Sequence, residues 1–221
     1  MKETKSEKKA ENTGKSKDYT FIKALGIAVL GLLMLAGIAG ASPFAYITNL
    51  DNTVSVVDTA TDRVTATISV GKEPFGVAVH PDGSRVYVTN FGNQTLSVIN
   101  TTTNKVIATV PVGIIGRGVA VSPDGKKVYV TGMGIYVFDT ATNSITTTID
   151  VGFTPLGIAV SPDGKRIYAT DHAVQGTVSV IDTATNKVIS NIKVGGGTWG
   201  IAVSPKGTEV YATNRQDNTY L

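Results

Sequence analysis

The chain contains no cysteine, few aromatic residues and few charges: of its 221 residues, 7% are aromatic and 17% are charged. The absence of Cys excludes a disulfide scaffold, thiolate metal sites and thiol nucleophiles. Only two His occur, and no EF-hand loop or His-x-x-x-His spacing is found, so we expect no metal and no cofactor. With 42% hydrophobic residues, the chain nevertheless has the composition of a globular protein.

The folded part of the chain also lacks an excess of positive charge. Residues 1–23 contain seven Lys and four acidic residues, and this difference accounts for the whole net charge of +3. Residues 24–221 are therefore electrically balanced, whereas proteins that bind nucleic acid usually carry a basic patch or stripe. We expect no nucleic-acid partner.

One uncharged segment, residues 24–41, is long enough to be a membrane-targeting segment. Its 18 residues would span about 27 Å as a helix, close to the thickness of a bilayer core of about 30 Å. The Lys-rich residues 1–23 precede it, which places them in the cytoplasm and residues 42–221 outside. The segment is either a retained transmembrane signal anchor or the core of a signal peptide cleaved near Ala41. The protein is then anchored at the cell surface or secreted.

Three motifs recur in the same order through the remainder of the chain, which is the signature of a repeat architecture. The first reads Tyr-(Ile/Val/Ala)-Thr-(Asn/Gly/Asp) and begins at Tyr46, Tyr87, Tyr129, Tyr168 and Tyr211. The second reads Gly-(Val/Ile)-Ala-Val and begins at Gly76, Gly118, Gly157 and Gly200. The third is a Thr-rich turn that begins at Asp58, Asn100, Asp139 and Asp182.

Each repeat reads as four short strands. In the second repeat, the segments 76–79, 85–89, 95–99 and 105–110 are rich in β-branched and apolar residues, with turn sequences between them. The first of these is almost wholly apolar, so we expect it to be buried on both faces. Short loops between successive strands predict an antiparallel up-and-down sheet, and four strands in about 40 residues match one blade of a β-propeller.

The sequence Tyr-Val-Thr-Asn at 87–90, with its variants at 46–49 and 211–214, resembles the YVTN β-propeller repeat. The resemblance covers about residues 44–221 and is greatest to archaeal surface-layer-type proteins. It implies a non-enzymatic cell-surface protein with structural or adhesive duties, and it carries over no catalytic residue. Propeller lactonases and the propeller domains of some quinoprotein and copper enzymes resemble the chain more distantly.

The predicted fold is therefore all-β: a β-propeller of four-stranded antiparallel blades over residues 42–221, preceded by one hydrophobic N-terminal helix. The repeats amount to roughly four blades and begin in the second strand of a blade. We expect an open arc with bare strand edges. Three outcomes stay open: a homodimer that completes a ring, a single closed four-bladed ring, or a truncated member of a longer family.

Candidate ligand-binding residues lie where the first strand of each repeat begins. The equivalent positions are occupied by Phe75, Arg117, Leu156 and Trp199, near the expected central channel. His172, in the loop 171–177, and the loops 90–95 and 214–218 are further candidates, because variable loops on a rigid repeat often bind ligands. Trp199 could instead be a core residue. Asn93 and Asn100 begin Asn-x-Thr sequons, which are candidate N-glycosylation sites.

The residues give little support to catalysis. The repeated acids Asp58, Asp139 and Asp182 are predicted to cap turns, because the second set has Asn100 in their place, and capping tolerates Asn whereas general-base catalysis does not. His80 is predicted to be a turn residue. The first strands of the repeats carry no acidic residue, so we expect structural duty or protein and glycan binding at the cell surface. The alternative is a lactonase- or hydrolase-like propeller enzyme, or an extracytoplasmic ligand carrier.

Overall fold

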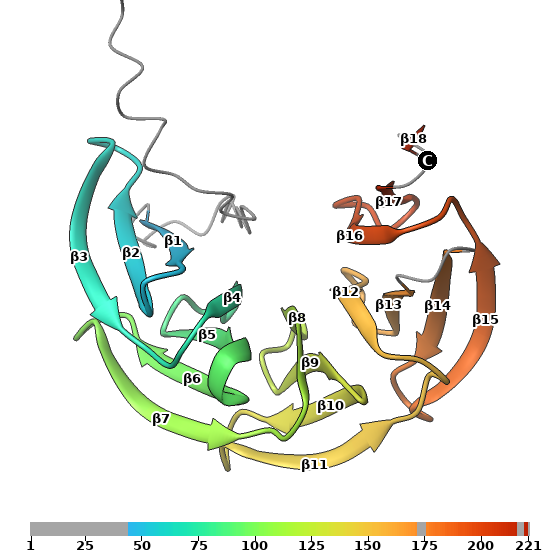
Figure 1. Ribbon diagram of the computed structural model, residues 1–221, viewed down its shortest axis with the longest axis horizontal. Coiled ribbons are helices and arrows are strands. Elements are labelled where there is room, and N and C mark those ends of the chain that lie inside the picture. The colour runs from blue at the N-terminus through green and yellow to red at the C-terminus, as the bar shows by residue number, and fades with distance from the viewer. Residues whose placement is uncertain (1–43, 172–175, 216–218, 221) are drawn as a thin grey trace, which may run out of the picture.

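Antiparallel sheets follow one another around an open arc in the computed structural model, which describes residues 44–171, 176–215 and 219–220 (Figure 1). Three complete four-stranded sheets lie between two three-stranded ones. The first sheet contains β1 (Phe44–Asn49), β2 (Thr53–Asp58) and β3 (Arg63–Ser69). The second contains β4 (Pro74–Val79), β5 (Arg85–Asn90), β6 (Thr95–Asn100) and β7 (Lys105–Pro111).

The remaining sheets repeat this order. The third contains β8 (Ile115–Val121), β9 (Lys127–Gly132), β10 (Gly134–Asp139) and β11 (Ser144–Ile149). The fourth contains β12 (Pro155–Val160), β13 (Arg166–Asp171), β14 (Thr177–Asp182) and β15 (Lys187–Lys193). The last contains β16 (Thr198–Val203), β17 (Val210–Asn214) and β18 (Thr219–Tyr220).

This architecture confirms an all-β fold with about four blades of a β-propeller. Each complete sheet runs from an inner to an outer strand in chain order, and the chain enters the arc in the second strand of a blade, as predicted. The tail 1–23 and the apolar segment 24–41, with its expected helix, lie outside the described residues. Within the described ranges, no helix combines the length and apolar character that crossing a membrane requires.

The inner strands differ from the expectation in one respect. Most residues of β4 and β12 are only half-buried, so the prediction that these strands are buried on both faces is wrong. The reason is their position: they line the hollow side of the arc, where no further layer covers them (Figure 1). A 3₁₀ turn, η2 (Phe91–Asn93), also interrupts the strands after β5, where the sequence shows no helical pattern.

The hydrophobic core is divided into four layers, each between two successive sheets. In every layer, the Tyr of one blade's repeat packs against the apolar strands of the next blade. Tyr87, for example, is fully buried with Val128 and Val130 of the third sheet, and its ring meets that of Phe138 edge-on at 6.1 Å between centroids. The four layers are centred on Tyr46, Tyr87, Tyr129 and Tyr168.

A polar contact accompanies each layer and explains the Thr of the repeat. Thr89 accepts a hydrogen bond from the Gly76 amide at 2.8 Å and donates one to the Arg117 carbonyl of the next blade at 3.3 Å. Thr131 and Thr170 repeat this arrangement with the carbonyls of Leu156 and Trp199, and Thr48 of the first sheet donates to the Phe75 carbonyl at 2.9 Å. We call this contact the threonine clamp. It joins neighbouring inner strands through a hydroxyl that lies in the dry interior.

The clamp also explains the repeated Gly. A Cβ atom on Gly118 would lie 2.5 Å from the Leu156 carbonyl oxygen, and Gly76 and Gly157 face the next inner strand in the same way. A side chain at any of these positions would therefore push two blades apart.

The last sheet presents half of this interface, and none of the described residues covers it. Tyr211 is 53% exposed, whereas its four equivalents are buried. Thr213 is also exposed, although its hydroxyl accepts a hydrogen bond from the Gly200 amide. A Cβ atom on Gly200 would meet nothing closer than 3.3 Å. The described residues therefore end in a face shaped for another blade.

The turn acids have the local role that the sequence predicts. Asp58, Asp139 and Asp182 each accept hydrogen bonds from backbone amides two and three residues later, and Asn100 accepts from the Thr103 amide. Their capping function is thus confirmed.

His80 does more than complete its turn. Its Nδ1 lies 2.6 Å from an Asp82 carboxylate oxygen, and its Nε2 lies 2.9 Å from the Gly125 carbonyl oxygen of the next blade. His80 therefore links two blades at the end opposite the clamp. Hydrogen bonds from the Ser84 hydroxyl and amide, and then from His80, lower the pKa of Asp82 to about 2.

The first prediction concerns the close approach between inner strands. Replacing Gly118 with Ala should lower the free energy of unfolding by about 2 kcal/mol, because overpacked contacts typically cost about 1–3 kcal/mol. Gly200→Ala is the matched control and should lower it less, since within one copy of the chain its Cβ meets only the Thr213 hydroxyl, at 3.3 Å, and no carbonyl of a further blade. Urea unfolding of the full-length chain would measure both. Equal effects of the two substitutions would contradict the proposed role of the clamp.

The second prediction concerns Asp82. Its lowered pKa means that the carboxylate stabilises the fold above its ordinary pKa of 3.8, and that this stabilisation disappears as the pH falls through about 2. Asp82→Asn should therefore be less stable than the native chain at pH 5, with the gap closing towards pH 2. Unfolding curves at the two pH values would test this. A gap that stays constant with pH would show that the charge has no role.

Candidate functional site

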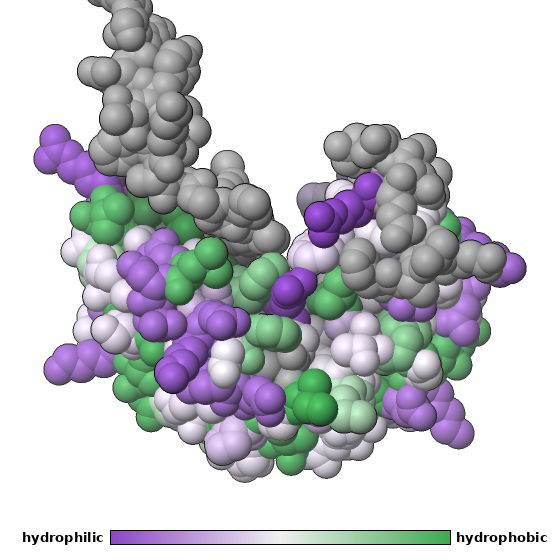
Figure 2. Space-filling view, viewed as in Figure 1, coloured by the Kyte–Doolittle hydropathy of each residue, from purple (hydrophilic) through white to green (hydrophobic). Residues whose placement is uncertain are grey.

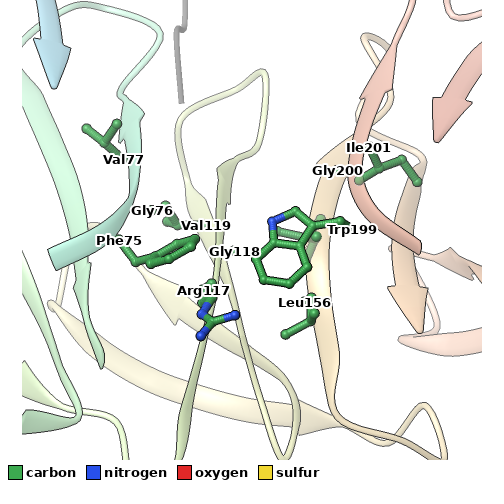
Figure 3. A pocket seen from close by; sticks show the side chains of 12 residues that line it. Phe75, Gly76, Val77, Arg117, Gly118, Val119, Leu156, Trp199, Gly200 and Ile201 are labelled. Carbon is green, nitrogen blue, oxygen red and sulfur yellow. The ribbon is translucent and has the colours of Figure 1, made fainter. Parts of the chain in front are cut away.

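A cavity of about 240 Å³ lies where the inner strands begin, on the hollow side of the arc (Figure 3). Each of four inner strands contributes three consecutive residues to its wall. The lining residues are Phe75, Gly76 and Val77 from β4, Arg117, Gly118 and Val119 from β8, Leu156, Gly157 and Ile158 from β12, and Trp199, Gly200 and Ile201 from β16. We call this cavity the channel-mouth pocket.

An irregularity in each inner strand turns these side chains towards the pocket. The pairing of β4 with β5 shifts between Pro74 and Val77, where the inner strand has one extra residue. The same shift occurs in β12 and β16, and β8 carries two extra residues between Ile115 and Val119. Such bulges bend a strand and re-aim its side chains. The bulge is widest in the strand that carries Arg117.

Four residues predicted from the sequence are brought together here. Phe75, Arg117, Leu156 and Trp199 come from four different sheets and point into one space (Figure 3). Their backbone carbonyls are also the acceptors of the threonine clamps, so the bonds that hold the blades together fix these positions as well. Trp199 is half-buried and lines the pocket, in contrast to the alternative of a core position.

Arg117 is the charged group of the pocket lining. Its guanidinium carbon lies 4.8 Å from the centre of the Phe75 ring and 5.0 Å from that of Trp199. Phe91, from the turn after β5, approaches it to 5.3 Å. These distances are typical of cation–π contacts. The Arg117 Nε is buried without a hydrogen-bond partner among the described residues.

Sequence reasoning missed two residues of this arrangement, Phe91 and Arg215. The guanidinium carbon of Arg215 lies 5.9 Å from the centre of the Trp199 ring, and the Phe91 ring contacts Arg117. Both belong to the loops 90–95 and 214–218 that the sequence indicated as candidates. The spacing of the repeats alone gave no signal for these two, because neither occupies a repeated position.

The remaining candidates lie elsewhere. His172 falls outside the described residues, so its place relative to the pocket is not described. Asn93 is exposed in the 3₁₀ turn, where its side-chain oxygen accepts a hydrogen bond from the Lys72 amide at 3.0 Å. Asn100 is half-buried at the end of β6, with its side-chain oxygen engaged by Thr103. Of the two sequons, Asn93 is therefore the more accessible.

A second hollow, of about 250 Å³, lies between the third and fourth sheets beside Ser122, Asp124 and Asp163. The Ser122 and Ser161 hydroxyls donate to these two carboxylates at 2.6 Å and lower the pKa of both. Burial and the charge of Asp124 raise the pKa of the neighbouring Tyr129 to about 12. The acids here stay ionised and are occupied by their own turns, so this hollow resembles a gap between turns more than a reaction site.

Across the ranges that the structure describes, no three His, Cys, Asp or Glu side chains gather closely enough to hold a metal ion. The pocket lining likewise has no acidic side chain among the described residues. Around the hollow of the arc, hydrophilic and hydrophobic residues lie side by side (Figure 2). The arrangement can bind and orient a ligand through one guanidinium and several rings.

Comparison with known proteins places the chain among propellers. The YNCE-like β-propeller family matches residues 23–155. No curated protein matches the chain.

Among solved structures, hydrazine synthase of Kuenenia stuttgartiensis is 28% identical, with a TM-score of 0.74 over 78% of this chain and 53% of the other. The Cps50 (Swd1) β-propeller domain of Myceliophteria thermophila shares the fold, with 13% identity and a TM-score of 0.69 over 78% of this chain and 59% of the other. The chain thus spans little more than half the length of either structure.

Proposed function

The chain belongs to the YNCE-like β-propeller family, and on this premise we propose that it is a non-enzymatic binding protein of the cell envelope. The propeller presents the channel-mouth pocket to a protein or glycan, in the manner of a surface-layer component. The observation that carries the proposal is the convergence of Phe75, Arg117, Leu156 and Trp199 on one cavity. Aromatic and guanidinium groups of this kind dominate binding sites.

The chemistry of the pocket favours binding over hydrolysis. A lactonase- or hydrolase-like activity needs converging carboxylates or imidazoles that transfer protons at the reacting atoms. The described lining offers Gly, aliphatic and aromatic residues and a single Arg. Hydrazine synthase is an enzyme, but the chain matches only 53% of that structure, so its activity is not carried over. A ligand carrier outside the cytoplasm would use the same pocket and is the second candidate.

The N-terminal residues support the placement in the envelope. The Lys-rich residues 1–23 followed by the uncharged residues 24–41 have the order of a membrane anchor or an export signal. We propose that residues 42–221 lie outside the membrane, tethered or released. Protection of this part from protease added to intact cells would contradict the placement.

The third prediction tests the pocket as the binding surface. The full-length chain, kept dispersed in mild detergent, should capture a partner on a glycan array or in a pull-down from envelope extracts. Trp199→Ala should weaken that binding by at least about tenfold, because it removes a large aromatic contact from the pocket. Val64→Ala, an exposed position on the outer strand β3, is the control. Failure to find any partner, or equal loss in both variants, would overturn the proposal.

We propose in addition that a second copy of the chain covers the exposed face of the last sheet. Tyr211 and Thr213 of that face repeat residues that are buried between blades elsewhere. One copy of the chain covers 53% and 59% of the two similar solved structures, so two copies together would match the length of either one. These observations support a homodimer that completes a ring.

The fourth prediction concerns this dimer. Sedimentation of the full-length chain in density-matched detergent should give twice the mass of one chain. Tyr211→Arg should yield monomers, because it places a charge in the interface, while Val64→Arg should leave the dimer intact. A native chain that sediments as a monomer would overturn the dimer.

A further inference from the structure

We infer that the channel-mouth pocket takes a carboxylate-bearing sugar, that is, a uronic acid unit of an acidic glycan. This inference rests on the proposed binding function and names its ligand class.

The charge of the pocket is positive and unneutralised. Among the described residues, no ion pair joins Arg117 to an acidic side chain, and its Nε has no hydrogen-bond partner although it is buried. The rings of Phe75, Phe91 and Trp199 stabilise the cation in part, but they accept none of its N–H groups in the plane of the guanidinium. A carboxylate fits this planar fork with two parallel hydrogen bonds.

A second cation also approaches the indole. Arg215 is exposed, and its guanidinium carbon stands 5.9 Å from the centre of the Trp199 ring, compared with 5.0 Å for that of Arg117. No acidic side chain belongs to the described lining. The described lining of the pocket therefore favours an anion over a cation.

The walls of the pocket determine what kind of molecule can carry the carboxylate. Phe75 and Trp199 face the space above Arg117 from opposite sides, and Leu156 extends the apolar surface below the indole (Figure 3). The C–H face of a sugar ring packs on such an indole face, while its hydroxyls stay in the open mouth. A free inorganic anion would use the guanidinium but leave these walls without contacts.

The size of the pocket is that of one ring. Its volume of about 240 Å³ lies below the range of about 300–1,000 Å³ that holds drug-sized ligands. One monosaccharide unit therefore fills it, and the neighbouring units of a chain lie along the hollow of the arc. An acidic peptide also carries carboxylates, but its side chains lack a rigid ring to occupy the aromatic walls.

Trp199 makes the test direct, because it is the only Trp of the chain and its fluorescence reports on this pocket alone. The full-length chain in mild detergent is titrated with trigalacturonate, with the methyl ester of the same trisaccharide, and with free galacturonate. We expect saturable changes with trigalacturonate and at least about tenfold weaker binding of the uncharged ester. Free galacturonate should bind more weakly than the trisaccharide but with the same preference for the acid.

Variants assign the preference to Arg117. Arg117→Gln should bind the acid and the ester equally, and Arg117→Lys should retain only part of the preference, because an ammonium group lacks the planar fork. Arg63→Gln, on the outer strand β3, should match the native chain. Circular dichroism and urea unfolding verify that each variant is folded. If the glutamine variant does not fold, the lysine variant still tests the preference for the acid.

The outcomes separate this inference from the proposed function. Equal binding of acid and ester, or of polyglutamate and trigalacturonate, would overturn the uronic acid while a binding propeller still stands. Absence of sugar binding in a chain that captures another partner through Trp199 would overturn the sugar alone. Absence of every partner would remove the proposed function as well.

Discussion

Contact between successive inner strands is the constraint on which this structure depends. The Gly amide, the Thr hydroxyl and the carbonyl of the next blade form a chain of hydrogen bonds where neither a side chain nor a water layer separates the blades. The Tyr layer outside it then excludes water from the clamp. Because the acceptor carbonyls belong to Phe75, Arg117, Leu156 and Trp199, the same contact that builds the arc also positions the pocket.

The repeat made much of the fold predictable. Tyr, Thr and Gly recur because each meets the adjacent blade, and a period of about 40 residues leaves room for four strands and their turns. The convergence of equivalent positions followed from the same argument, since residues at the start of every inner strand must meet near the axis. Asp and Asn in the turns were predictable from local hydrogen bonding alone.

The parts that escaped prediction are those that break the repeat. The position of Arg117 at the pocket was predicted, but its ring contacts were not, because they depend on a two-residue bulge that periodicity does not show. Phe91 comes from a loop of one blade only. His80 replaces a Ser found in the equivalent turns and thereby reaches the next blade, a contact that depends on blade spacing rather than on local sequence.

The exposed face of the last sheet has a consequence for the dynamics of the pocket. In a linear array, each unit is stabilised by its neighbours, so a terminal unit with one neighbour opens first. The sheet that contains β16 and β17 is such a unit in the described arc, and it supplies the indole of Trp199. A ligand that bridges the indole and Arg117 therefore also holds the terminal blade in place, so that occupancy of the pocket and closure of the arc's end become thermodynamically linked.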